Sequence, residues 1–122
     1  MLKYLSSRLK SFGHAWTGLA FLMKSEPHAR VHLLATTVVL ITAWALDVSR
    51  QDWLWLILAI TLVWICEAVN TAFEYLCDVV SPEFSQDVKL AKDIAAAAVL
   101  IAAIAAVIIG VIVFIPYFRS LF

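Results

Sequence analysis

Residues 53–66 read WLWLILAITLVWIC, an unbroken apolar run that ends at Glu67, the first charged residue after it. Helical apolar character continues to about Val80, and Ser81-Pro82 ends the pattern. About 20 apolar residues suffice for a helix to cross the hydrocarbon core of a bilayer. This stretch predicts a transmembrane helix over residues 53–80 and decides the fold class.

Two further apolar segments flank this helix. Residues 31–46 contain no Asp, Glu, Lys or Arg, and Pro27 fits the first turn of a helix, so we expect a span over 28–46. The alanine-rich residues 94–118 predict another span, whose small side chains let neighbouring helices approach closely in lipid. Polar residues 47–52 predict a short turn, and a polar segment separates the last two spans.

The N-terminal segment, residues 2–26, predicts an amphipathic helix. Apolar residues recur along it at spacings of four and three, and basic residues lie beside the stripe. The stripe consists of Leu5, Leu9, Phe12, Trp16, Leu19 and Met23. The pattern suits a helix packed on protein or one lying in the headgroup layer, and we favour the interfacial helix because three spans follow.

The composition agrees with an all-α membrane protein of one domain over residues 1–122. The chain is 64% hydrophobic and only 15% charged, too apolar for a soluble domain of its length. Its formal net charge is zero, so no basic field points to nucleic acid.

Basic residues predict the topology, because cytoplasmic segments carry the excess of Lys and Arg. Only Arg50 and Arg119 fall on the other side of the predicted spans. The basic residues expected in the cytoplasm are Lys3, Arg8, Lys10, Lys24, Arg30, Lys89 and Lys92. We therefore expect a cytoplasmic N-terminus and an outward C-terminus.

A stripe of polar side chains interrupts the second span. At about 100° per residue, Glu67, Glu74 and Asp78 lie within about 20° of one direction around the helix, and Asn70 lies about 60° away. Ionisable groups at this depth cost a few kcal/mol and usually have a functional reason. The acids are expected at the cytoplasmic boundary, close to the depth of a membrane lipid's hydroxyl.

Two interpretations of these acids stay open. Cations across the helices, chiefly Arg30, Lys89 and Lys92, could neutralise them. Alternatively, the surplus of carboxylates could hold Mg²⁺, which prefers oxygen ligands and often binds together with phosphates. Glu26 is expected at the same level as Glu74, so the position alone suggests a Mg²⁺ between these two.

Two classes of site are disfavoured by the sequence. No glycine-rich loop precedes a Lys-Ser/Thr pair, so a P-loop is excluded. His28 and His32 are four residues apart and could ligate a metal, but such pairs more often lie in helix interfaces, and we assign them no metal role. A non-catalytic channel or assembly subunit is the rival hypothesis, since a polar stripe could line a pore.

The pattern Glu67-x-x-Asn70-x-x-x-Glu74-x-x-x-Asp78, followed by Ala91-Lys92-Asp93 and an alanine-rich span, resembles the prokaryotic diacylglycerol kinase family. The resemblance extends upstream through His14-Ala15-Trp16-x-Gly18-Leu19 and Glu26-x-x-x-Arg30, and it covers nearly the whole chain. It implies a homotrimeric lipid kinase of the bacterial inner membrane, with ATP as co-substrate, Mg²⁺ as cofactor and active sites shared between subunits.

The resemblance also implies roles for individual residues. Glu67 would be the catalytic base, Glu26 and Glu74 the metal ligands, and Asn70 and Asp78 supporting residues. Trp16, Gly18 and Arg30 would lie near the paths of lipid and nucleotide. The nucleotide would meet His14, Glu26, Glu74, Glu83, Phe84, Ser85, Lys92 and Asp93; for His14, a packed or hydrated side chain is an equal alternative.

The family includes enzymes that act on diacylglycerol and others that act on undecaprenol. His32, the turn from Asp47 to Leu54 and Phe114-Ile115-Pro116 resemble the undecaprenol kinase branch, whereas enterobacterial diacylglycerol kinases carry an acid at the position of His32. We therefore expect undecaprenol ahead of diacylglycerol. Residues 94–98, IAAAA, depart from the family pattern, in which a Gly or Ser is expected there.

Overall fold

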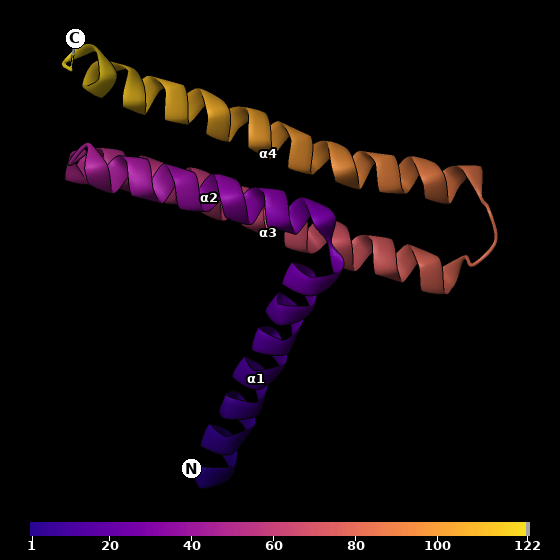
Figure 1. The fold of residues 1–122 in the computed structure, drawn as a ribbon. Coiled ribbons are helices and arrows are strands. Elements are labelled where there is room, and N and C mark those ends of the chain that lie inside the picture. The colour runs from indigo at the N-terminus through magenta and orange to yellow at the C-terminus, as the bar shows by residue number, and fades with distance from the viewer. Residues whose placement is uncertain (122) are drawn as a thin grey trace.

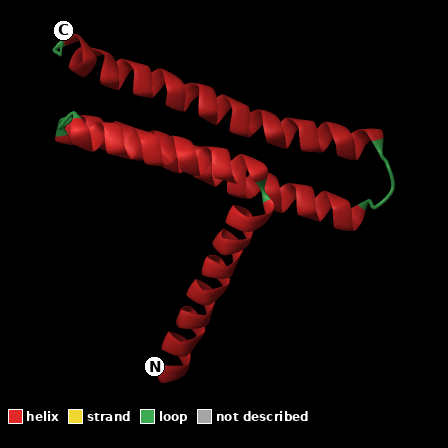
Figure 2. Ribbon diagram, viewed as in Figure 1, coloured by secondary structure: helices red, strands yellow, loops and turns green. Residues whose placement is uncertain are grey.

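The computed structural model describes residues 1–121, apart from the side chains of four of them, Leu2, Lys3, Leu5 and Ser25. The predicted contributions of Lys3 to topology and of Leu5 to the apolar stripe therefore lie outside the described residues. The described chain folds into α1 (Leu2–Ser25), α2 (Pro27–Ala45), α3 (Arg50–Val80) and α4 (Gln86–Arg119) (Figures 1 and 2). Of these, α2, α3 and α4 are long and apolar enough to cross a membrane, which confirms the predicted all-α class with three spanning helices.

The two longest helices, α3 and α4, form an antiparallel hairpin with α2 alongside one end of it (Figure 1). At 1.5 Å per residue they are about 46 and 51 Å long, longer than the roughly 30 Å hydrocarbon core of a bilayer. Helix α2 is about 28 Å long and matches that thickness. The α3–α4 hairpin therefore extends beyond the end of α2, on the side of the α3–α4 connection.

Serine caps explain why α3 and α4 begin earlier than the apolar runs alone indicate. Ser49 Oγ accepts a hydrogen bond from the Asp52 backbone N–H at 3.1 Å, so α3 begins at Arg50 instead of residue 53. In the same way, Ser85 Oγ accepts a hydrogen bond from the Val88 backbone N–H and caps α4. This helix begins at Gln86, eight residues before the predicted start. An i,i+4 ion pair from Lys89 to Asp93 supports this polar first part of α4.

A sharp bend at Glu26 separates α1 from α2. Glu26 has an extended backbone, φ −102° and ψ 116°, as expected for a residue before proline, and Pro27 opens α2. Arg30 Nη2 donates to the Lys24 carbonyl at 2.8 Å and so satisfies an unpaired carbonyl at the end of α1. Helix α1 consequently projects away from the hairpin (Figure 1), touching α3 where the Phe21 and Tyr75 rings meet edge to face at 5.2 Å.

The opposite end of the bundle is closed by packing and hydrogen bonds. Ala43, Val48, Leu56 and Val113 form the buried cluster there. Tyr117 of α4 donates its hydroxyl proton to Asp52 at 2.5 Å and accepts from the Ser49 backbone N–H at 2.9 Å. These contacts fasten the end of α4 to the α2–α3 turn. Most other apolar side chains on the spans face outward, as expected for helices whose solvent is lipid.

Candidate active site

The predicted catalytic carboxylate, Glu67, is buried within the bundle. Only 3% of its surface is exposed, and Thr71, one turn further along α3, is buried too. His32 of α2 faces it, with 3.5 Å between His32 Nε2 and Glu67 Oε2. A carboxylate at this depth is costly in lipid and is expected to face a partner in the bundle interior. The structure provides that partner from α2.

The ring of His32 is itself positioned by α3. The His32 and Trp64 rings meet edge to face, with centroids 6.3 Å apart. The Trp64 indole N–H donates to Thr36 Oγ1 at 3.1 Å. Trp64 of α3 thus contacts two residues one turn apart on α2, and these contacts fix how α2 lies against α3 near Glu67.

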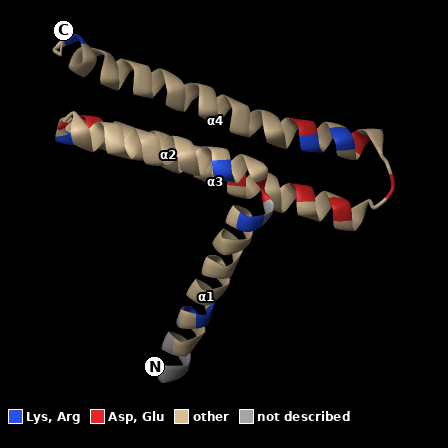
Figure 3. Ribbon diagram, viewed as in Figure 1, with Lys and Arg blue, Asp and Glu red and all other residues tan. Residues whose placement is uncertain are grey.

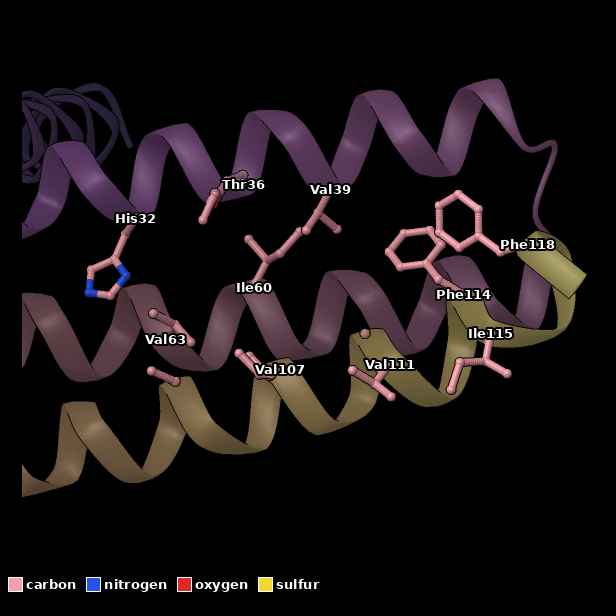
Figure 4. A pocket seen from close by; sticks show the side chains of 14 residues that line it. His32, Thr36, Val39, Ile60, Val63, Val107, Val111, Phe114, Ile115 and Phe118 are labelled. Carbon is pink, nitrogen blue, oxygen red and sulfur yellow. The ribbon is translucent and has the colours of Figure 1, made fainter.

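An apolar groove leads away from His32 along α2, α3 and α4 (Figure 4). Its volume is about 490 Å³. His32 is the only ionisable side chain among its lining residues and lies at one end, whereas Phe114 and Phe118 lie at the other (Figure 4). The groove combines an aliphatic wall with one polar end, a suitable environment for a hydrocarbon chain that carries a polar group.

The polar stripe becomes more exposed towards the end of α3. Asn70 and Glu74 are half-buried, and Asp78 is exposed. Asn70 Nδ2 donates to Glu74 Oε1 at 3.1 Å, while Asn70 Oδ1 is buried and accepts no hydrogen bond among the described residues. The amide therefore orients the Glu74 carboxylate and retains a free acceptor beside it.

Ion pairs lie where α3 and α4 extend beyond α2. Lys92 Nζ is 2.8 Å from Asp78 Oδ1, and Lys89 Nζ is 2.7 Å from Asp93 Oδ2. Acidic and basic residues gather in this region and near the α1–α2 bend, and a second group lies at the opposite end of the bundle (Figure 3). This end of the bundle therefore presents exposed carboxylate and ammonium groups.

The other predicted residues surround this region without joining one network. Glu26 is half-buried at the bend, and Arg30 holds the end of α1. His14 and Trp16 are exposed on α1, while Gly18 lines a cavity of about 500 Å³ between α1 and α3. The α3–α4 connection contains Glu83, Phe84 and Ser85; Phe84 is exposed, Ser85 caps α4, and the Glu83 carbonyl accepts from Ser81.

The structure brings together some predicted residues but not all of them. The pairs in contact are Asn70 with Glu74 and Asp78 with Lys92. Within the described residues, no group of three or more His, Cys, Asp or Glu side chains lies close enough to hold a metal ion. The roles of Glu26 and Glu74 as metal ligands remain predictions.

Comparison with known proteins settles the family. The sequence profile of the prokaryotic diacylglycerol kinases matches residues 13–114. The chain belongs to the prokaryotic diacylglycerol kinase family. A diacylglycerol kinase of Synechocystis sp. is 38% identical over 114 residues, which cover 93% of this chain and 65% of that protein.

Two other relatives of this family member match over most of their own length. The undecaprenol kinase of Bacillus subtilis is 33% identical over 92% of this chain and 91% of its own. The diacylglycerol kinase of Escherichia coli K12 is 36% identical over 82% of each. Both names denote lipid kinases, so the assignment of this chain to the lipid kinases is confirmed at the level of the family. The family and the three spans together indicate an integral membrane protein.

Sequence reasoning missed His32 as part of the site. Its spacing from His28 was visible, but a spacing along one helix does not show which residue of another helix faces it. The available signal was the antiparallel order of the two spans, which brings the start of α2 next to the later turns of α3. The exact pairing of His32 with Glu67 needed the helix register.

Proposed function

We propose that this family member transfers the γ-phosphate of ATP to the hydroxyl of a membrane lipid at the cytoplasmic interface. The observation that carries the proposal is the burial of Glu67 beside the polar end of an apolar groove. A lipid chain in the groove would bring its hydroxyl to the level of this carboxylate. Phosphoryl transfer requires little more than positioned groups and charge stabilisation.

The chain's own residues account for the proton and the nucleotide. Glu67 accepts the proton of the lipid hydroxyl while the oxygen of that hydroxyl forms a bond to the γ-phosphorus of ATP. The bond from that phosphorus to the bridging oxygen breaks, and ADP leaves. Lys92 and Asp93 bind the nucleotide, and Lys92 exchanges Asp78 for a phosphate when ATP arrives. His14, Glu83, Phe84 and Ser85 complete the nucleotide's surroundings.

The oxygen-rich end of α3 suits Mg²⁺. This ion is usually held by one or two carboxylates together with substrate phosphates, and Glu26 and Glu74 would supply them. Asn70 holds Glu74 by a hydrogen bond and has a free buried oxygen beside it, which fits a hydrated cation. When bound, Mg²⁺ neutralises charge on the transferring phosphates.

We propose that the protein works as a homotrimer in the bacterial inner membrane with a cytoplasmic N-terminus. The outward apolar faces of α2 and α4 leave ample surface for packing against further copies. A second chain next to the charged end would contribute ligands that one chain does not bring together. The exposed apolar stripe of α1, with Trp16 73% and Phe12 75% exposed, suits a helix lying in the headgroup layer.

We place undecaprenol ahead of diacylglycerol as the lipid. The sequence features that resemble the undecaprenol kinase branch support this order, and the long aliphatic groove suits a polyprenyl chain. Relatives carry both names at comparable identity, so the assay has to offer both lipids.

The test is ATP-dependent phosphorylation by purified protein in lipid micelles. Undecaprenol and diacylglycerol are supplied separately, with Mg²⁺ or with a chelator, and the phosphorylated lipid is measured. We expect phosphate on undecaprenol, and none in the presence of chelator. Transfer to diacylglycerol alone would overturn the choice of lipid, and transfer to neither lipid by folded protein would overturn the proposed function.

A channel or assembly subunit is less well supported. A pore for ions needs polar groups along its length, but most described charged residues lie towards the ends of the bundle (Figure 3), and Glu67 is the charged residue nearest the middle of α3. The polar stripe ends at Glu67, and the groove beyond it is lined by aliphatic and aromatic side chains.

A further inference from the structure

Among the described residues, the basic side chain that lies against Glu67 is that of His32, with 3.5 Å between His32 Nε2 and Glu67 Oε2. The Glu67 side chain is 4% exposed and that of His32 is 18% exposed, so water contributes little to the solvation of either group. A buried charge that loses its partner is strongly destabilised. His32 therefore determines the environment of the proposed base more than any exposed residue can.

The position of His32 is built into the fold. Trp64 lies against its ring, and the hydrogen bond from Trp64 to Thr36 fixes Trp64. His28, one turn earlier on α2, is exposed and makes no comparable ring contact among the described residues. The two histidines thus differ in surroundings although they share a helix and a residue type.

His32 also belongs to the groove. Figure 4 shows its ring extending from α2 towards α3 at the end of the apolar lining. A group in this place touches both the carboxylate and the space through which a lipid hydroxyl would reach it. A merely structural histidine would not need to meet both requirements.

We propose that His32 is a positioning residue for Glu67. In the tautomer with hydrogen on Nε2, the imidazole N–H faces Glu67 Oε2 and holds the carboxylate at the end of the groove, directed at the arriving hydroxyl. His32 itself transfers no phosphate and needs no metal. The inference rests on the proposed function, in which Glu67 accepts the proton of the lipid.

Three substitutions of His32 test this role. His32→Gln keeps an N–H donor near the position of Nε2. In His32→Asn the side chain is too short for its amide to reach the Glu67 carboxylate, and His32→Ala removes the donor. Loss of a general base costs about 10²–10⁴ in rate, and loss of an orienting partner is expected to cost about 10–100-fold. We expect His32→Ala and His32→Asn to lower kcat by that factor, with KM for the lipid changed by less than about threefold.

The rescue by glutamine distinguishes positioning from packing. His32→Gln should retain kcat within about fivefold of the native protein, and His28→Ala, the matched control, should match the native protein. Oligomeric state in detergent is measured for every variant; if His32→Ala does not fold, the comparison of glutamine with asparagine still decides. Equal kcat for the glutamine and asparagine variants, or an effect on KM alone, would overturn the inference.

Glu67→Gln separates this inference from the proposed function. If Glu67→Gln keeps full activity, the proposed base is wrong, and the positioning role is wrong with it. If Glu67→Gln abolishes transfer but His32→Ala keeps the native kcat, only the inference about His32 is wrong.

Discussion

The ammonium group of Lys92 lies 2.8 Å from the Asp78 carboxylate and joins the ends of α3 and α4 beside the connection between them. Asp78 is 69% exposed in this pair and Lys92 is 33% exposed. Exposed ion pairs contribute only about 0–1 kcal/mol, so the contact stabilises the fold little. A lysine held this loosely can turn to a phosphate at small cost.

Lys92→Ala is therefore expected to act on the nucleotide and to leave stability almost unchanged. A hydrogen bond to a charged group contributes about 1.5–3 kcal/mol, so KM for ATP should rise roughly 10- to 100-fold. Steady-state kinetics against ATP measure the effect. Arg119→Ala, an exposed basic residue at the opposite end of α4, serves as the control and should change KM for ATP by less than about threefold. Equal effects of the two substitutions would contradict the role of Lys92.

Tyr117→Phe tests the closed end of the bundle. The substitution removes the donor to Asp52 and the acceptor for the Ser49 N–H, and we expect unfolding free energy to fall by about 1–3 kcal/mol with kcat unchanged. Denaturant or thermal unfolding in detergent measures the loss. The control is Tyr4→Phe, because the exposed Tyr4 hydroxyl accepts a hydrogen bond from its neighbour Arg8 on the same helix. An equal change in both variants would contradict a stabilising role for the contacts of Tyr117.

Gly110 tests the groove. A Cβ at this position meets no atom within 4 Å, so Gly110→Ala should be tolerated. Because alanine has the higher helix propensity, the substitution should raise the free energy of unfolding by at most about 1 kcal/mol. Gly110→Leu places a bulky side chain in the groove and should raise KM for the lipid about tenfold with KM for ATP unchanged. Unchanged lipid kinetics in a folded Gly110→Leu variant would contradict occupation of the groove by the lipid.

Glu74→Gln tests the proposed metal ligands. We expect a higher Mg²⁺ concentration for half-maximal activity, by about tenfold, because one anionic ligand is lost. Glu26→Gln should act in the same direction. Asp87→Asn, on the exposed first turn of α4, is the control. A Mg²⁺ dependence that stays the same in both glutamine variants would show that these carboxylates do not hold the metal.

The sequence was sufficient for the elements of the fold. Long apolar runs identified the three spans because a helix that crosses lipid needs about 20 apolar residues, and Pro27 marked the bend. The polar start of α4 was not expected to be helical, since hydropathy carries no information about a helix extending beyond the membrane. The Ser85 cap and the Lys89–Asp93 spacing were the local signals for it.

The candidate site was only partly predictable. The spacing of Glu67, Asn70 and Glu74 placed them on one face of a helix, and the hydrogen bond between Asn70 and Glu74 follows from their i,i+4 separation. Contacts between helices depend on register and rotation, which no periodicity within one helix determines. For that reason the pairing of His32 with Glu67 became visible only in the structure. The sequence had offered Lys92 as a cation that could neutralise the acids, and the structure shows that the acid it pairs with is Asp78.

The most direct test compares transfer of the γ-phosphate to undecaprenol by the native protein and by Glu67→Gln. Asp47→Asn, an acid-to-amide change in the exposed turn at the opposite end, is the matched control. We predict normal transfer by the native and Asp47→Asn proteins, and a loss of at least about 100-fold for Glu67→Gln with the oligomer intact. Undiminished transfer by Glu67→Gln would contradict the assignment of this buried carboxylate as the base.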